Sequence, residues 1–490
     1  MRPMPDSLKV PLAPTPATVA TAATASAKAG HKGLIWLVAA AFFMQALDST
    51  IVNTAVPGIA SALAVTPLSM RSALTTYVLT LAIFIPASPW LCDRFGTRRV
   101  FGAAIGVFAL GSLLCGLAQS LPQLVAARVV QGLGGAALMP VGRYVLVRTI
   151  ERKDFVSSMT TVATFGLIGS VLGPLLGGVL VQYTSWRAIF LINVPVSLLG
   201  MYLNRRQMPD YRLTESRRFD TLGFVLFAGA SAMLLLASEK AGGVGEWGKV
   251  AMWSAVAVLL GFLYVLHSRR TEFPVTDLKL LKVRSVAVAL AGNLFTRLGV
   301  SGMFLLLVLF LQLGCGWSPS VVGLMMVPQA LGAIAVKWVV NRLLLRLGYR
   351  RLLLGNTVAV SLMLASFTLV GPQTPLPVIA LQVFAYGAFM SLQYSSMNTL
   401  AYVDLDVSHA SMASSMASTA QYLSMSFGIA LASLLMEAFL AGHEPAQYVH
   451  AFRCSILILA AMTLAASWIF SRLRKDRPVN ARTTDETTSV

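Results

Sequence analysis

The sequence predicts an all-α polytopic membrane protein, with two six-helix bundles and two further helices inserted between them. Three observations carry this prediction. Apolar residues make up 56% of the 490 residues and charged residues only 12%, and the mean hydropathy of +0.73 lies far above that of soluble domains. Apolar runs of about 20 residues, long enough to span a bilayer, recur along the chain. Finally, a basic turn of the form Arg-x-Gly-x-Arg-Arg occurs twice, at 94–99 and 346–351.

Composition also excludes several classes of protein. The net charge of +19 could indicate a nucleic-acid partner, but the basic residues lie in short loops between apolar runs, so we expect no nucleic acid. The four cysteines are scattered and imply no disulfide framework. The five histidines are dispersed without metal-ligand spacing, and no Gly-x-x-x-x-Gly-Lys-Ser/Thr loop is present. We therefore expect no metal site and no enzyme.

The chain divides into five parts. Residues 1–32 are rich in Pro, Ala and Thr and are expected to form a disordered cytoplasmic tail. The first six-helix bundle is expected at 33–203, a linker with two extra spans at 204–285, the second bundle at 286–471, and a cytoplasmic tail at 472–490. The fourteen predicted spans are 34–60, 72–91, 100–118, 121–147, 157–182, 186–203, 219–238, 250–267, 286–312, 320–341, 352–370, 376–402, 411–440 and 452–471.

The distribution of Lys and Arg predicts the orientation. If the N-terminal tail is cytoplasmic, 29 of the 38 basic residues fall in inside segments and five in outside segments. This excess follows the positive-inside rule and predicts that both termini are cytoplasmic. The two basic turns then follow spans 2 and 10, and this offset equals a six-helix repeat plus the two inserted spans. Duplicated halves of this kind are typical of transporters.

Asp48 in the first span and Arg128 in the fourth are predicted to lie at a similar depth. At about 1.5 Å per residue, Asp48 lies roughly 20 Å from the inner end of its helix and Arg128 roughly 10 Å from the outer end of its own. A core about 30 Å thick puts both at one level. An acid at that depth can hold and release a proton. We therefore predict a proton-coupling pair; the alternative is a neutral hydrogen bonder that only packs helices together.

The fifth span contains a face of small residues. Gly166, Ser170, Gly173 and Gly177 share one helical face, and the same span also contains Gly169, Pro174 and Gly178. Small residues allow another helix to approach closely, and Pro174 bends the span. The spacing does not distinguish generic tight packing from a moving interface.

Polar residues inside other spans are candidates for a substrate cavity, because polar side chains at this depth face a cavity or another helix rather than lipid. Arg297 falls roughly mid-bilayer and would favour an anionic substrate over a cation; pairing with backbone carbonyls is the alternative. Methionines and aromatic residues accompany the later positions and suit an unselective pocket. The candidates are Gln45, Asn53, Arg297, Gln393, Tyr394, Asn398 and Gln421.

These motifs together resemble the major facilitator superfamily, and within it the fourteen-helix drug:proton antiporters of the EmrB/QacA type. The residues of these motifs are most similar to those of the HsrA/MdtD-like branch of this family. The stretch 47–57 resembles its first-helix motif, 128–135 its fourth-helix proton-relay motif and 169–178 its antiporter motif. The stretch 186–195 is also typical of the family. Pro89 departs from the pattern, because the family usually has Gly four residues before Asp93.

The resemblance implies a major facilitator fold and alternating access, in which a proton moves inward as a substrate leaves. It implies a conformational latch at Asp93, Arg94, Gly96 and Arg98, with Asp93 beside Ser411 at the start of span 13. The expected function is export of amphiphilic drugs or other small organic molecules. Export of one metabolite or organic anion, or a sensor that transports nothing, remain alternatives.

The same resemblance implies an energy source, a location and a set of partners for the protein. The proton gradient is the expected energy source, with no cofactor. The expected location is the bacterial inner membrane, with the lipid bilayer as surroundings and protons and a small-molecule substrate as partners. A monomer is expected, and pairing with a periplasmic adaptor and an outer-membrane channel stays open.

Overall fold

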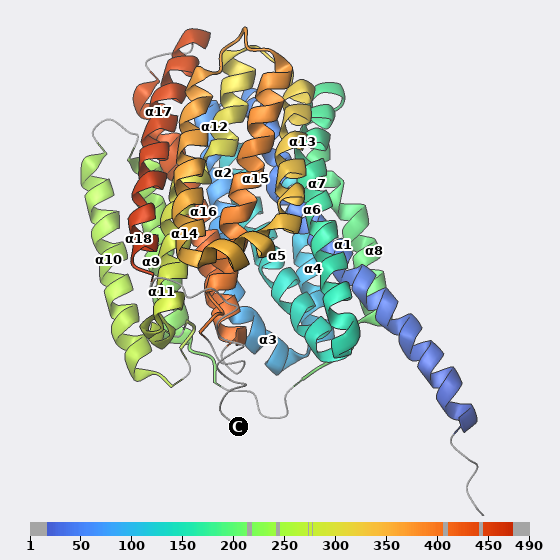
Figure 1. Cartoon of the computed structure of the whole chain (residues 1–490). Coiled ribbons are helices and arrows are strands. Elements are labelled where there is room, and N and C mark those ends of the chain that lie inside the picture. The colour runs from blue at the N-terminus through green and yellow to red at the C-terminus, as the bar shows by residue number, and fades with distance from the viewer. Residues whose placement is uncertain are drawn as a thin grey trace, which may run out of the picture.

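The structure is a computed structural model that describes residues 17–212, 218–241, 246–272, 274–276, 278–404, 410–440 and 444–473. Within its helices, the side chains of 17–31, 152–153, 156 and 410–413 lie outside this description. Every regular element in the described residues is helical (Figure 1). Most of the helices are long and run side by side. The predicted all-α fold is therefore confirmed.

The first six spans are built from eight helices. Their bounds are α1 (Ala17–Ala62), α2 (Arg71–Phe84), α3 (Ser88–Phe95), α4 (Thr97–Leu117), α5 (Leu121–Thr149), α6 (Arg152–Tyr183), α7 (Ala188–Leu191) and α8 (Asn193–Gln207). A 3₁₀ turn at Ile85–Ala87 separates α2 from α3, so Pro89 stands in the first turn of α3, where its missing N–H costs nothing. The span therefore continues through this short turn, with Pro89 just after it.

The inserted pair and the second bundle complete the fold. The inserted hairpin is α9 (Thr221–Lys240) and α10 (Trp247–Arg270). The second bundle contains α11 (Arg284–Val300), α12 (Met303–Leu309), α13 (Pro319–Ala335), α14 (Lys337–Ser366), α15 (Leu376–Leu400), α16 (Ala410–Phe439), α17 (Pro445–Ala465) and α18 (Ser467–Ser471). Helix α9 packs against α2 and α16, which places the hairpin beside the seam between the two bundles.

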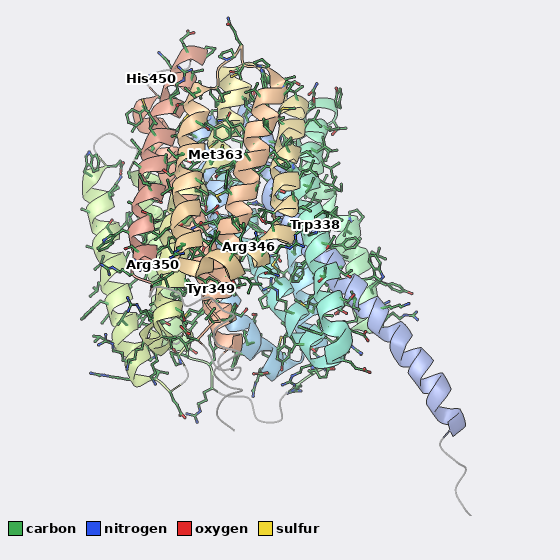
Figure 2. The ribbon with its side chains drawn as sticks, viewed as in Figure 1. Trp338, Arg346, Tyr349, Arg350, Met363 and His450 are labelled. Carbon is green, nitrogen blue, oxygen red and sulfur yellow. The ribbon has the colours of Figure 1, made fainter. Side chains whose placement is uncertain are left out.

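Thirteen helical segments in the described residues are long and apolar enough to cross a membrane, and α13 is a shorter apolar helix of 17 residues. With α13 counted, the described residues contain fourteen spans. The first part of α14 carries Trp338 and Arg346 and runs across the ends of its neighbours before the chain turns (Figure 2). Span 10 is therefore α13 alone, ending near Ala335 rather than at the predicted 341.

Both basic turns have the same backbone conformation. Gly96 has φ 87° and ψ 146°, and Gly348 has φ 72° and ψ 166°. This region is open to glycine and strained for other residues, so both turns require Gly. In Figure 2, Arg346, Tyr349 and Arg350 mark the second turn. The matching conformation supports a duplicated origin for the two halves. We call the side of the protein with these two turns the inner face, and the opposite side the outer face.

Two elements differ from the sequence prediction. Helix α1 begins at Ala17, so residues 17–32 are helical rather than part of an unstructured tail. Their many alanines are strong helix formers and extend the first span. The predicted span 286–312 is confirmed as one apolar segment, Arg284–Gly314, but its helix is interrupted by a turn at Ser301–Gly302, where Gly302 packs closely on α16. Residues 1–16 and 474–490 of the two tails lie outside the described residues.

Candidate functional site

The site is built around Asp48, in the middle of α1. Its carboxylate is fully buried, and so is the guanidinium of Arg128 on α5, which is 1% exposed. The Nη1 of Arg128 donates to Asp48 Oδ2 at 2.8 Å, and its Nε donates to the carbonyl of Ala73 at 3.4 Å. The structure thus brings together the two residues that were placed at one depth from helical rise alone.

Two amides complete the surroundings of the carboxylate. Gln131 on α5 and Asn193 at the start of α8 each donate to Asp48 Oδ1, at 2.8 and 3.0 Å. Both amides also donate to Ser112 Oγ on α4, at 2.6 and 3.3 Å, and Arg128 Nη1 donates to Gln131 Oε1 at 2.6 Å. Four helices therefore meet at one carboxylate, which accepts three hydrogen bonds.

Aromatic rings enclose the pair. The Cζ of Arg128 lies 4.1 Å from the ring centroid of Tyr77 and 5.6 Å from that of Phe190. Rings at this distance attract the cation and exclude water. Because neither charge reaches solvent, removing one partner would leave the other unpaired, which typically costs about 3–5 kcal/mol. The buried ion pair therefore fixes the position of α1 relative to α5 in this conformation.

Sequence reasoning missed Gln131, Ser112 and Asn193 as members of this network. Gln131 lies three residues after Arg128, on the same helical face, and this spacing could have identified it. Asn193 lies in the stretch 186–195 that resembles a family motif, but its contact with Asp48 depends on how α8 packs against α1. Ser112 has no comparable signal and joins the network only by accepting hydrogen bonds from the two amides.

The glycines of α6 make two different contacts. A Cβ at Gly173 or Gly177 would overlap atoms of α1 in the same bundle. A Cβ at Gly178 would overlap the carbonyl of Pro319 on α13, in the other bundle, and Gly323 of α13 faces the Pro174 carbonyl just as closely. Gly169 also packs on α1. One motif therefore supports both packing within a bundle and a contact between bundles.

Further contacts between the bundles lie near the outer face. Gln312, in a π-helical turn after α12, donates from Nε2 to the carbonyl of Thr54 at 2.9 Å. The amide of Ser320 donates to Gln182 Oε1 at 3.2 Å. We call these contacts, together with those of Gly178 and Gly323, the outer seal.

A cross-bundle ion pair lies beside the outer seal. Arg71 at the start of α2 pairs with Glu437 near the end of α16, and its Nη2 donates to the carbonyl of Glu239 on α9 at 3.0 Å. It therefore joins both bundles and the inserted hairpin. The sequence showed Arg71 and Glu437 near the outer ends of their spans, but their separation of 366 residues carried no sign of the pairing.

Predicted cavity residues have different surroundings. Gln393 is fully buried between α14 and α15, where its Nε2 donates to Thr357 Oγ1 at 2.9 Å and its Oε1 accepts from Asn356 Nδ2 at 2.7 Å. Its polar atoms are satisfied within its own bundle, so in this conformation it joins helices and does not face a cavity. Among the described residues, Asn53 donates only to carbonyls of its own helix, those of Ser49 and Thr50.

The other predicted cavity residues are less fully satisfied. Gln45 is 2% exposed, and its Oε1 has no hydrogen-bond partner among the described residues. Asn398 is exposed, whereas Tyr394 and Gln421 are half-buried. Arg297 is 7% exposed, and its Cζ lies 3.7 Å from the ring centroid of Tyr394.

The predicted latch residues lie around the first basic turn. Arg98 donates from Nε to the Met208 carbonyl at 2.6 Å, and its backbone N–H donates to Asp210 Oδ1 at 3.2 Å, so the segment after α8 holds the turn. Arg94 is exposed, and Asp93 is half-buried. The side chain of Ser411, the expected partner of Asp93, lies outside the described residues.

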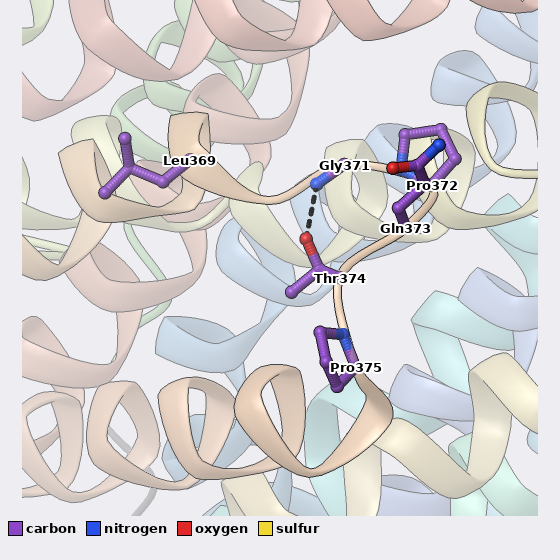
Figure 3. A pocket seen from close by; sticks show the side chains of 6 residues that line it. All are labelled: Leu369, Gly371, Pro372, Gln373, Thr374 and Pro375. Atoms are coloured by element: carbon purple, nitrogen blue, oxygen red, sulfur yellow. Dashed lines mark hydrogen bonds between the residues drawn. The ribbon is translucent and has the colours of Figure 1, made fainter.

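Other parts of the described surface make weaker candidate sites. A hollow of about 430 Å³ lies on the outer loop between α14 and α15, lined by Leu369 and residues 371–375 (Figure 3). Its lining has no charged side chain, and its one drawn hydrogen bond, from Gly371 N to Thr374 Oγ1 at 2.9 Å, only closes the loop. No group of three His, Cys, Asp or Glu side chains in the described residues could hold a metal ion.

Comparison with known proteins yields one family. The sequence profile of the Major Facilitator Superfamily matches residues 38–429. A Salmonella heidelberg protein described as "Putative multidrug resistance protein MdtD" is 41% identical over 456 residues, which cover 91% of this chain and 96% of the relative. A Serratia proteamaculans protein of the same description is 40% identical over 463 residues, with 92% and 95% covered.

Solved structures agree at the level of the fold. A bacterial homologue of the human lysosomal transporter Spinster, in an inward-facing and unoccupied conformation, superposes with a TM-score of 0.64. The two chains are 14% identical, and the match covers 90% of this chain and 96% of the other. The resemblance stated from the motifs is confirmed, and this multi-pass membrane protein belongs to the Major Facilitator Superfamily.

Proposed function

We propose that this chain is a proton-coupled antiporter that exports amphiphilic small organic molecules by alternating access, with the proton gradient as its energy source and no cofactor. The observation that carries the proposal is the buried pair of Asp48 and Arg128. The Asp48 carboxylate lies within the first span and accepts three hydrogen bonds, one of them from this guanidinium. It takes up a proton when α1 and α5 separate enough to weaken those contacts. The description of the MdtD relatives as multidrug resistance proteins supports export.

Helix α1 provides a direct link from the proton site to the outer seal. Thr54 lies six residues after Asp48, or about 9 Å along the helix. Its carbonyl accepts the hydrogen bond of Gln312 from the second bundle, and its hydroxyl donates to the carbonyl of Pro174 at 3.2 Å. A rotation or shift of α1 that accompanies protonation of Asp48 would therefore act on the outer seal without an intermediate element.

The proposed setting follows from the charge distribution. The excess of Lys and Arg in the segments on the inner face supports cytoplasmic termini in a bacterial inner membrane. In this orientation the outer seal closes the periplasmic side, and substrate enters from the cytoplasm. We propose a monomer as the working unit, because each chain contains both bundles and the proton site.

Everted vesicles test the proposal. With an acidic lumen, the wild-type protein is expected to accumulate a fluorescent amphiphile in the lumen, and an uncoupler is expected to abolish this accumulation. Asp48→Asn keeps the side-chain volume but cannot exchange a proton, so it should abolish uphill accumulation. Asp154→Asn is the matched control, because Asp154 is an exposed carboxylate near the inner end of α6. Full uphill accumulation by Asp48→Asn, at normal expression and insertion, would contradict the proposed role of Asp48.

A further inference from the structure

Arg297 on α11 is a buried cation without a carboxylate partner in the described part of the chain. Only 7% of its surface is exposed, and at about 1.5 Å per residue it lies roughly 20 Å along α11 from Arg284. Its Nε donates to Asn293 Oδ1 at 2.5 Å. Arg128, the other arginine at comparable depth, is neutralised by Asp48. Arg297 therefore differs from Arg128 in having an uncompensated charge.

The rest of the guanidinium is available to a ligand. Of its five N–H donors, one is used by Asn293, and the four on the two Nη atoms have no hydrogen-bond partner among the described residues. Neither Nη atom is among the fully enclosed unpartnered polar atoms, so both border space that water can reach. A cation at this depth is costly without a counter-charge. An anion with two oxygens fits the planar fork of donors.

Aromatic side chains surround this open edge. The ring of Tyr394 on α15 stacks on the guanidinium at 3.7 Å from Cζ. Tyr422 lies on α16, which packs along α11, and it is near enough to Arg297, and to Arg143 on α5, for both charges to act on its hydroxyl. The Tyr422 hydroxyl donates to the sulfur of Met139, also on α5, at 3.7 Å. Tyr422 therefore lies where the two bundles meet, and Arg297 lies beside it.

Arg143 adds a second cation on the inner side of this position. It is exposed and lies about 9 Å from the inner end of α5 by helical rise. Its Cζ lies 5.6 Å from the ring of Phe42, and no carboxylate of the described residues pairs with it. A negatively charged molecule that arrives from the inner face thus meets one cation from the first bundle and then one from the second.

We propose that Arg297, Tyr394 and Tyr422 form the binding site for an aromatic organic anion, a carboxylate or sulfonate, and that such anions are substrates of the exporter. This inference rests on the proposed antiport function and specifies its substrate class. The guanidinium binds the anionic group through its free Nη donors, and the tyrosine rings contact the aromatic part. Arg143 attracts the anion toward the site from the inner face. Quaternary ammonium compounds are repelled by the same two charges.

The proposal has an electrical consequence. If one proton enters for each monovalent anion that leaves, each cycle transfers a net charge of +2 inward. Export of the anion is then driven by an inside-negative membrane potential as well as by the pH gradient. Exchange of one proton for one monovalent cation would move no net charge. Dependence on the membrane potential therefore separates the two substrate classes.

Binding to the full-length protein in phosphatidylcholine nanodiscs provides the test. The probes are 1-naphthalenesulfonate and 1-naphthylmethylammonium, which share one ring system and differ in charge. We expect the wild-type protein to bind the anion more tightly than the cation. Arg297→Gln should weaken anion binding about tenfold or more, as expected for loss of hydrogen bonds to a charged group. Lys337→Gln is the matched control, because Lys337 is an exposed cation in the same bundle, and it should leave anion binding unchanged.

Two results would overturn the site. One is equal affinity of wild type and Arg297→Gln for 1-naphthalenesulfonate. The other is tighter binding of 1-naphthylmethylammonium than of the sulfonate by wild type, which is decisive even if the variant does not fold. Transport separates this inference from the antiport proposal. Arg297→Gln should still export the neutral 1-naphthalenemethanol in an uncoupler-sensitive manner, because Asp48 is intact. If that export persists while wild type binds no anion, the site is wrong and the antiport stands.

Discussion

Adding one methyl group at Gly178 should open the outer seal. In the structure a Cβ at this position would lie 2.8 Å from the carbonyl carbon of Pro319, where ordinary contacts begin at 3.4 Å. The obstacle is backbone and cannot rotate away, so α6 and α13 must separate by at least about 0.6 Å for the seal to close. Overpacking of this kind costs about 1–3 kcal/mol. The same energy shifts a two-state equilibrium about 5–150-fold, so Gly178→Ala should favour the outward-open state.

Labelling of a buried residue in α13 measures this shift. Val322 is fully buried beside the seal. In a background without the native cysteines, Val322→Cys should react with a membrane-impermeant maleimide only when the outer seal opens. The labelling rate is then proportional to the outward-open population, so Gly178→Ala should raise the labelling rate about 5–150-fold.

Two other glycine-to-alanine substitutions serve as controls. Gly355→Ala adds the same methyl group in α14, where nothing lies within 4 Å of the new atom. Both changes gain the same helix propensity, so their difference isolates the steric effect. Gly134→Ala overlaps the backbone of α4 within the first bundle, away from α1 and the outer seal, and should lower stability without raising the labelling rate. Equal labelling of the Gly178→Ala and Gly355→Ala proteins, both folded, would refute the reasoning.

Two further predictions concern the cross-bundle ion pair and the first basic turn. Glu437→Gln removes the cross-bundle ion pair with Arg71, but the Glu437 side chain is 40% exposed, so the effect should be about 1 kcal/mol or less. It should raise Val322→Cys labelling only a few-fold, and high salt should produce the same rise in wild type. Gly96→Ala forces a side chain into a strained backbone region, which should cost about 1–3 kcal/mol of folding stability and lower the thermal unfolding midpoint. Gly106→Ala in α4 is the control and should leave the midpoint unchanged. An unchanged midpoint in Gly96→Ala would contradict the predicted strain.

The sequence alone determined features that depend on position along one helix. Hydropathy located all fourteen spans, because a bilayer demands about 20 apolar residues in a row. The two Gly-centred turns were predicted from residue type, and both glycines have a positive φ. The common level of Asp48 and Arg128 followed from helical rise. Span 10 was placed less well, because Lys337 alone marks the break after Ala335 and apolar residues resume on either side of it.

Tertiary structure decided which side chains meet around each helix. Depth does not give the direction in which a side chain points, so Gln393 was predicted at a cavity but is satisfied by Asn356 and Thr357 inside its own bundle. Asn193 reaches Asp48 only because α8 packs beside α1. The two contact faces of α6 differ by a single residue, Gly177 against α1 and Gly178 against α13. Such neighbours depend on how helices far apart in sequence pack and rotate about their axes, and no one-dimensional pattern specifies that.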